Sequence, residues 1–76
     1  MQLEIITPDT TLFSGTASAV SLPGVQGRFQ VLENHAPLIA SLGNGNVVVD
    51  SAQGREEFKI NGGLIEVLRN KVVILA

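Results

Sequence analysis

The sequence predicts an all-β protein, a small β-sandwich or flattened barrel of short, mostly antiparallel strands that occupies residues 1–76 as a single domain. Apolar residues recur at a period of two in short pieces, and they nowhere keep the i, i+3, i+4, i+7 spacing of an amphipathic helix. Turn-forming residues separate these pieces at short intervals. Roughly nine short strands so close together need stacking or closure to hide their edges.

The first part of the chain predicts three strands. Residues 2–7 alternate apolar and polar side chains, and Pro8-Asp9 supplies the turn that follows. A short strand over 11–14 is expected to end at Gly15. In the third strand, over 17–22, Val20 and Leu22 share one face, while the small Ala17 and Ala19 share the other.

The stretch LPGVQGRFQVLENHAPL, residues 22–38, combines turn residues, an alternating strand and the only histidine. Pro23-Gly24 predicts a type II turn, so that the chain reverses before Phe29. Pro37 favours extended geometry at the preceding residue, and we therefore expect His35 to lie in a constrained loop.

The second half predicts five strands joined by glycine-rich turns. Gly43-Asn44-Gly45 and Gly62-Gly63 read as hairpin turns because positive φ costs glycine little. Ala52-Gln53-Gly54 and Asn70 mark two further turns. The strands between the turns are expected at 38–42, 46–51, 56–61, 64–69 and 72–75, and the last is apolar enough to predict burial on both faces. The predicted core residues are Val20, Phe29, Val31, Phe58, Ile60, Ile65 and Val67, and Phe58→Ala is expected to cost ~3–5 kcal/mol if that side chain is buried.

Composition excludes several classes of protein. The formal net charge is −2 and the five basic residues are scattered, so nucleic-acid binding is not expected. No apolar run approaches a membrane span, the start of the chain lacks a signal-peptide pattern, and without cysteine no disulfide can form. Charged residues make up 16% of the chain against ~25% in an average soluble protein, which indicates a surface covered in part by partners.

The residues predict no catalytic, cofactor or metal site. His35 has no cysteine and no clustered carboxylates to complete a zinc site or a triad. No glycine-rich run ends in Lys-Ser or Lys-Thr, so a phosphate loop is absent. Glu56 and Glu57 are neighbours on a strand and point to opposite faces. From the residues alone, His35 is a loop imidazole bonded to nearby backbone and Arg28 is a solvated charge.

Three ordered blocks carry a resemblance to a known family. The blocks together span nearly the whole chain: TPDTTLFSG near the start, then LPG followed by a second glycine and HAPL, and finally FKINGGLIEVLRNKVVILA. In this order they resemble the N-terminal β-sandwich of the epsilon subunit of the rotary ATP synthase. Gln30 and Glu33 stand where many members have Gly and Pro, and Arg28 stands where an acidic residue is often found.

The resemblance implies a non-catalytic rotor subunit that links the gamma subunit to the c-ring and couples rotation to ATP synthesis. It implies a gamma-facing side with Thr7, His35 and Ala40, and a ring-facing end with Val25, Gln26, Gly27 and Arg28. It also implies a peripheral position at the cytoplasmic face of the bacterial inner membrane, with no cofactor and no small-molecule ligand. Because the chain stops at Ala76, the family's C-terminal helical hairpin is expected to be missing, together with its ATP binding and its inhibition of hydrolysis.

The residues fit two other classes of protein less well. A lipoyl- or biotinyl-type carrier domain is also small and all-β, but it needs a lysine at a hairpin tip, whereas Lys59 falls within a predicted strand and Lys71 at a strand start. A free-standing ligand-binding barrel would need a sizeable apolar cavity, for which the short strands leave little volume.

Overall fold

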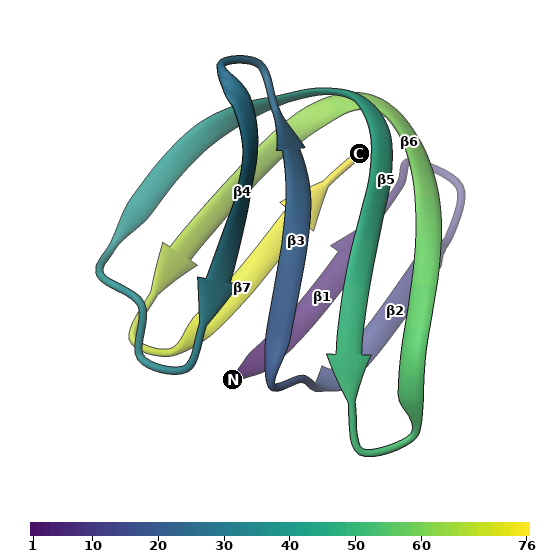
Figure 1. The fold of residues 1–76 in the computed structure, drawn as a ribbon. Coiled ribbons are helices and arrows are strands. Elements are labelled where there is room, and N and C mark those ends of the chain that lie inside the picture. Colours follow the sequence, from purple (N-terminus) through teal and green to yellow (C-terminus); the bar gives the residue numbers. More distant parts are fainter.

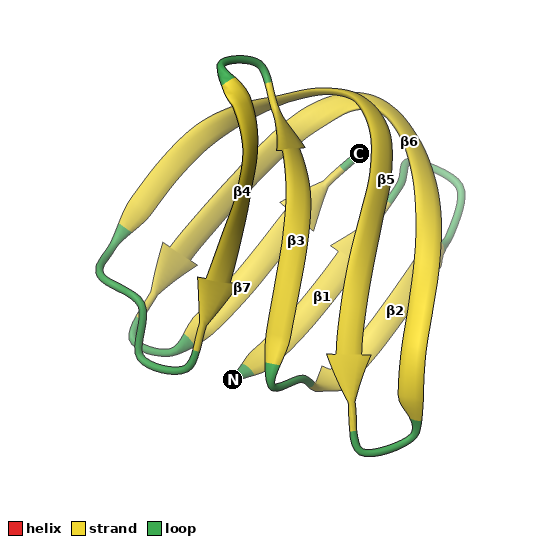
Figure 2. Ribbon diagram, viewed as in Figure 1, coloured by secondary structure: helices red, strands yellow, loops and turns green.

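The computed structural model describes residues 1–76 and contains seven strands and no helix (Figures 1 and 2). The strands are β1 (Gln2–Ile6), β2 (Thr11–Thr16), β3 (Ala19–Gly24), β4 (Gly27–Leu32), β5 (Leu38–Ser51), β6 (Gly54–Leu68) and β7 (Lys71–Leu75). The all-β prediction is therefore confirmed.

The strands form one continuous hydrogen-bonded sheet that folds over onto itself as a sandwich (Figure 1). The strand order is β2-β1-β7-β6-β5-β3-β4, and only the β1–β7 pair is parallel. The first layer holds β2, β1 and β7 with the end of β6 and the start of β5. The second layer holds β3 and β4 with the start of β6 and the end of β5. β5 and β6 thus belong to both layers and join them.

The hairpins predicted at Gly43-Asn44-Gly45 and Gly62-Gly63 are wrong, because β5 and β6 run without interruption through both sites. The glycines bend the two long strands from one layer into the other, and this reduces nine predicted strands to seven. Gly45, Gly62 and Gly63 adopt positive φ, a conformation that glycine reaches cheaply. A Cβ at Gly63 would also collide with the carbonyl oxygen of Leu75, so this bend brings two strands closer than a side chain allows.

The core lies between the layers and contains 15 buried apolar residues. Five of the seven predicted core residues are buried: Val20, Val31, Ile60, Ile65 and Val67. Phe29 and Phe58 are only partly buried and pack against the core from its margins. Phe58 contacts Phe13 edge to face, with ring centroids 6.2 Å apart, because β2 and the start of β6 face each other across the side of the sandwich.

Burial of β7 on both faces is the second wrong prediction. Val72 and Ile74 are buried, but Leu75 is 50% exposed. β7 is central in hydrogen bonding, between β1 and β6. However, nothing in this chain covers the outer face of its layer, so an apolar strand exposes half of its side chains.

The end of β2 and the turn after β3 also differ from the positions predicted from the sequence. β2 continues through Gly15 to Thr16, and the turn after β3 lies at Val25-Gln26, later than Pro23-Gly24. Gly27 supplies the positive φ at the turn, and the chain reverses before Phe29 as predicted. β3 can include Pro23 because its nitrogen faces away from β4 in the antiparallel ladder, and the register with β5 is interrupted between Ser21 and Gly24, so no ladder hydrogen bond is lost.

Candidate functional site

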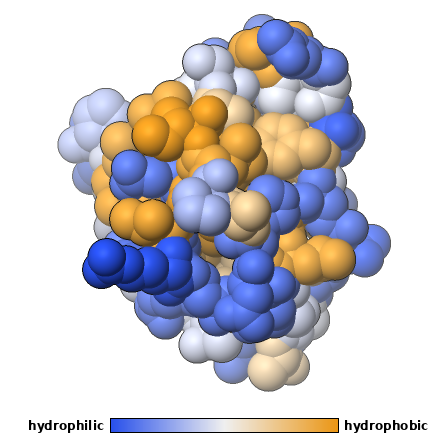
Figure 3. Space-filling view, turned by 90° about the vertical axis from the view of Figure 1, so that its left-hand side faces the viewer, coloured by the Kyte–Doolittle hydropathy of each residue, from blue (hydrophilic) through white to orange (hydrophobic).

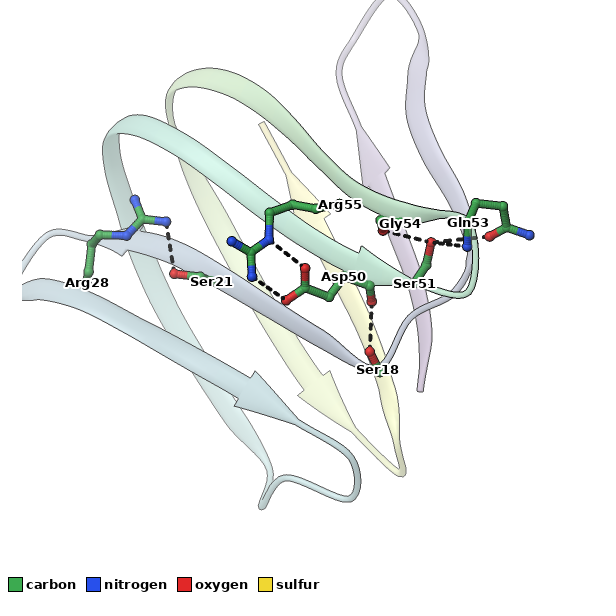
Figure 4. Close-up of polar contacts among 8 residues, drawn as sticks. All are labelled: Ser18, Ser21, Arg28, Asp50, Ser51, Gln53, Gly54 and Arg55. Carbon is green, nitrogen blue, oxygen red and sulfur yellow. Dashed lines mark hydrogen bonds and ion pairs between the residues drawn. The ribbon is translucent and has the colours of Figure 1, made fainter.

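The four residues predicted to face the ring lie together at the tip of the β3–β4 hairpin. Val25 and Gln26 form the two-residue loop, and Gly27 and Arg28 begin β4. Val25 is 64% exposed. The Arg28 guanidinium donates a hydrogen bond to the Ser21 hydroxyl, at 2.9 Å, and so lies along the outer face of the second layer (Figure 4).

The structure does not gather the three residues predicted to face the gamma subunit. Thr7 follows β1 and bonds through its hydroxyl to the backbone of Thr10. His35 lies in the β4–β5 loop, at the opposite end of the sandwich, because β1 runs parallel to β7 and this loop is bonded to the turn that precedes β7. Ala40 belongs to β5 and packs against the core from the inner face.

The loop that carries His35 is tied down by polar contacts. The His35 N–H donates to the Leu32 carbonyl oxygen at 3.2 Å, and its Nδ1 lies 2.7 Å from the Ala36 carbonyl oxygen. The Asn34 N–H donates to the Asn70 side chain at 2.8 Å. The imidazole therefore bonds to nearby backbone, while its half-buried ring still presents a surface to a partner.

Glu33 belongs to a cluster that sequence reasoning missed. Its carboxylate accepts hydrogen bonds from the Met1 ammonium group and from the Asn70 amide, and these bonds lower the pKa of Glu33. The Met1 ammonium also donates to the Ala17 carbonyl oxygen at 2.9 Å. These residues are distant in sequence, and no local pattern links them.

The outer face of the second layer is polar. Arg55 forms an ion pair with Asp50, Nε to Oδ1 at 2.8 Å, and this bond raises the pKa of Arg55 (Figure 4). Asn46 donates to Glu57 across the same β5–β6 pair at 3.1 Å. Opposite charges facing one another on neighbouring strands stabilise the ladder modestly and leave the face well hydrated.

The outer face of the first layer is more apolar. The strand register places Ile39 beside Glu66 and Val73, and Leu64 beside Leu75, on this outer surface. Across the whole chain, the exposed large apolar residues are Val25, Leu32, Ile39, Leu64, Leu68 and Leu75. Alternation predicts which side chains share a face of a strand. It does not predict which of the two faces the rest of the chain leaves exposed.

The hollows on the surface are open clefts. One groove, of about 590 Å³, runs between the β3–β4 hairpin and the start of β5 and is lined by residues 24–29 and 38–41. No three His, Asp or Glu side chains are grouped as metal ligands. The structure has no helix that could cross a membrane. Lys59 lies within β6, and no lysine stands at a hairpin tip.

Comparisons with known proteins match the whole chain. A family model described as the ATP synthase delta/epsilon chain β-sandwich domain matches residues 1–76. The ATP synthase epsilon chain of Chlorobaculum tepidum is 45% identical over 96% of this chain and 84% of the relative. The epsilon chain of Chlorobium limicola is 41% identical over 97% of this chain and 85% of the relative.

Other matches are to longer proteins. The epsilon chain of Salinibacter ruber is 39% identical, and this chain spans 57% of its length. A chain in the mitochondrial ATP synthase of Euglena gracilis, solved as OSCP/F1/c-ring, superimposes with a TM-score of 0.89 at 22% identity, over 97% of this chain and 48% of that one. At this identity the superposition shows the same fold.

Proposed function

This chain belongs to the ATP synthase delta/epsilon chain β-sandwich family, and we propose that it is a non-catalytic subunit of the central stalk of a proton-translocating rotary ATP synthase. One observation carries the proposal: relatives called ATP synthase epsilon chain are 41–45% identical to it over 84–85% of their own length. The subunit links gamma to the c-ring, so that rotation of the ring is transmitted to the stalk.

The architecture suits transmission of torque by contact. β5 and β6 run through both layers and pair along almost their whole length, from Leu38–Val67 to Ser51–Gly54, so load on one layer passes directly through the backbone ladder to the other. The surface has open clefts and several exposed apolar side chains. Several moderate protein interfaces, rather than one ligand pocket, fit such a surface.

The gamma-facing side includes Thr7, His35 and Ala40 in this proposal. Since Thr7 and His35 lie at opposite ends of the first layer, one gamma surface that reaches both must extend along that layer. The exposed apolar side chains of Ile39 and Leu64 lie on its outer face and would be covered by such a contact. Ala40 points inward, so a partner reaches it only through the groove beside the β3–β4 hairpin.

The ring-facing end is the hairpin tip, Val25, Gln26, Gly27 and Arg28. A tight two-residue loop projects these four residues together from the sandwich (Figure 1). The curated relatives named above are bacterial. The subunit accordingly lies at the cytoplasmic face of the bacterial inner membrane, as a peripheral part of the complex.

Binding to purified partners tests the proposal. The chain is titrated against the purified gamma subunit of its own complex by calorimetry, and the resulting pair is then added to purified c-rings in detergent. We expect a defined one-to-one complex with gamma, and capture of that pair by the ring. Absence of binding to gamma would reject the function.

Arg28→Glu tests the ring-facing end, with Lys59→Glu as a control that makes the same change of charge elsewhere in the second layer. Arg28 is exposed and its one hydrogen bond, to Ser21, is exposed to solvent, so the melting temperature should hardly change. Binding of the gamma pair to the ring should fall at least tenfold, because charge reversal in a partly desolvated contact costs a few kcal/mol. Equal binding by both variants would remove Arg28 from the contact.

A further inference from the structure

Both asparagine-glycine pairs of the chain lie in the arch where β5 and β6 pass from one layer to the other, at the top of Figure 1. They are Asn44-Gly45 in β5 and Asn61-Gly62 in β6, and the two asparagines lie directly opposite each other in the ladder. Both asparagine side chains are exposed. Neither the bend of the strands nor the proposed contacts with partners require an asparagine at these positions.

An exposed asparagine followed by glycine loses ammonia without a catalyst when the local backbone can rotate. The backbone nitrogen of the glycine gives up its proton and attacks the Cγ atom of the asparagine side chain. The bond from Cγ to the side-chain nitrogen breaks, ammonia leaves and a succinimide ring remains. Water then opens the ring at either of its carbonyl groups and leaves aspartate or isoaspartate. Glycine favours ring closure because its backbone rotates freely and no side chain hinders its nitrogen.

The strand ladder restrains Gly62 less than Gly45. β5 and β6 pair along their whole contact except at Gly43 and Gly62, which face each other without forming a ladder pair. Gly45, by contrast, pairs with Ile60. The nitrogen that would attack the Asn61 side chain therefore belongs to the one break in the β5–β6 ladder.

Packing distinguishes the two glycines in the same way. A Cβ at Gly45 would lie 2.8 Å from the Cβ of Pro23, so the backbone of Gly45 is packed closely against the base of the β3–β4 hairpin. A Cβ at Gly62 would meet only the Leu42 carbonyl oxygen, at an ordinary distance of 3.6 Å. Gly63 follows, and both it and Gly62 adopt positive φ. Rotation of the backbone at Gly62 thus displaces no packed side chain.

Water reaches this part of the arch. Asn61 and Gly62 line an open cleft of about 450 Å³ together with Thr7 and Lys59. The exposed large apolar residues lie elsewhere, and the side of the molecule seen in Figure 3 carries a broad apolar surface. None of these exposed apolar residues belongs to segments 43–45 or 60–63. The arch is therefore open to the water that hydrolyses a succinimide.

The three other asparagines are protected. Asn34, Asn46 and Asn70 are each followed by a residue whose side chain hinders the attacking nitrogen. The Asn46 amide also donates a hydrogen bond to the Glu57 carboxylate at 3.1 Å, and the Asn70 amide donates one to Glu33 at 3.2 Å. These three residues serve as internal controls.

We propose that Asn61 is a site of spontaneous deamidation, in which the Gly62 nitrogen closes the ring and water is the only co-reactant. Both products add one negative charge to the arch. In the isoaspartate product the main chain runs through the former side chain, which lengthens β6 by one methylene at its bend. Gly63, two residues later, lies too close to the Leu75 carbonyl oxygen for a side chain to fit between them. The longer backbone disturbs this close approach, so the isoaspartate form is less stable than the unmodified chain.

The inference does not depend on gamma or on the ring, and the folded chain alone tests it. The chain is incubated in mildly alkaline buffer, in which more of the glycine nitrogen is deprotonated. Peptide mapping by mass spectrometry follows conversion at Asn61 and Asn44, and enzymatic methylation identifies isoaspartate. We expect conversion at Asn61 to be about tenfold faster, because Gly45 must first leave its ladder pair and its contact with Pro23, and an opening of about 1.4 kcal/mol slows a step tenfold.

The same incubation in concentrated urea separates structure from sequence. Both asparagine-glycine pairs are then free to rotate, so their rates should become similar. In the folded chain, Asn61→Gln should remove the rapid conversion because glutamine would have to form a larger ring, whereas Asn44→Gln should leave it unchanged. The isoaspartate form, separated by anion exchange, should melt at a lower temperature than the unmodified chain.

Three outcomes would overturn the inference. The first is equal conversion at Asn61 and Asn44 in the folded chain. The second is a preference for Asn61 that persists in urea, because it would then come from the local sequence. The third is rapid conversion that survives in Asn61→Gln, because another residue would then be the site.

Discussion

Replacing Phe58 by alanine should destabilise the protein without unfolding it. A fully buried Phe→Ala change costs ~3–5 kcal/mol, the size expected from sequence if Phe58 were a core residue. The structure places Phe58 at the margin of the core, half-buried on an edge strand. Because solvent reaches the site and the surroundings can close on it, we expect a cost of about 2–3 kcal/mol.

Part of this cost belongs to one aromatic pair. Phe58 and Phe13 meet at an interplanar angle of 69°. Such edge-to-face pairs contribute about 0.5–1.5 kcal/mol beyond burial of area. A double-mutant cycle of Phe58→Ala and Phe13→Ala should return a coupling energy in this range, since the two rings are in direct contact.

Urea unfolding followed by far-UV circular dichroism measures these energies, because the chain has no Trp or Tyr to serve as a fluorescent probe. Leu22→Ala, at a fully buried position, is the control and should cost about 3–5 kcal/mol. A 76-residue domain has a stability of roughly 4–11 kcal/mol, so Phe58→Ala should stay mostly folded. If Phe58→Ala costs as much as Leu22→Ala, or if the coupling is zero, the marginal placement of Phe58 is wrong.

Two further predictions concern the strand bend and the Glu33 cluster. Gly63→Ala should destabilise the protein by about 2–4 kcal/mol, because the residue has positive φ and the added Cβ would meet the Leu75 carbonyl oxygen. Gly15→Ala is the control and should change stability by less than about 1 kcal/mol, because a Cβ there makes only ordinary contacts. Urea unfolding measures both variants, and equal effects would refute the close approach of Gly63 to Leu75. Glu33→Gln should lower the melting temperature near neutral pH. The folded-state pKa of Glu33 lies below its ordinary value, so its contribution is present above the ordinary pKa and is lost as pH falls through the folded-state pKa. The difference between the two proteins should vanish in strong acid, and a difference that persists there would have another cause.

The four residues proposed to face the ring could be predicted to lie together because they are contiguous in the sequence. Turn residues at 23–27 predict a reversal, and any reversal there brings Val25 and Arg28 to one tip, even though the turn falls later than expected. The residues proposed to face gamma could not be placed in this way, because Thr7 and His35 are far apart in the chain and their relative position depends on the parallel β1–β7 pair. No local pattern predicts a pairing between the first and last strands.

Alternation by itself determined the all-β class and five of the predicted core residues, because the period of side chains along a strand is local and independent of its neighbours. Tertiary structure decided what the glycines do. Gly43, Gly45, Gly62 and Gly63 permit either a hairpin or a bend, and the choice depends on whether the flanking segments pair with each other or with other strands. Here β5 and β6 pair with each other on both sides of the bend. The positive φ that would reverse the chain in a hairpin instead turns both strands from one layer into the other.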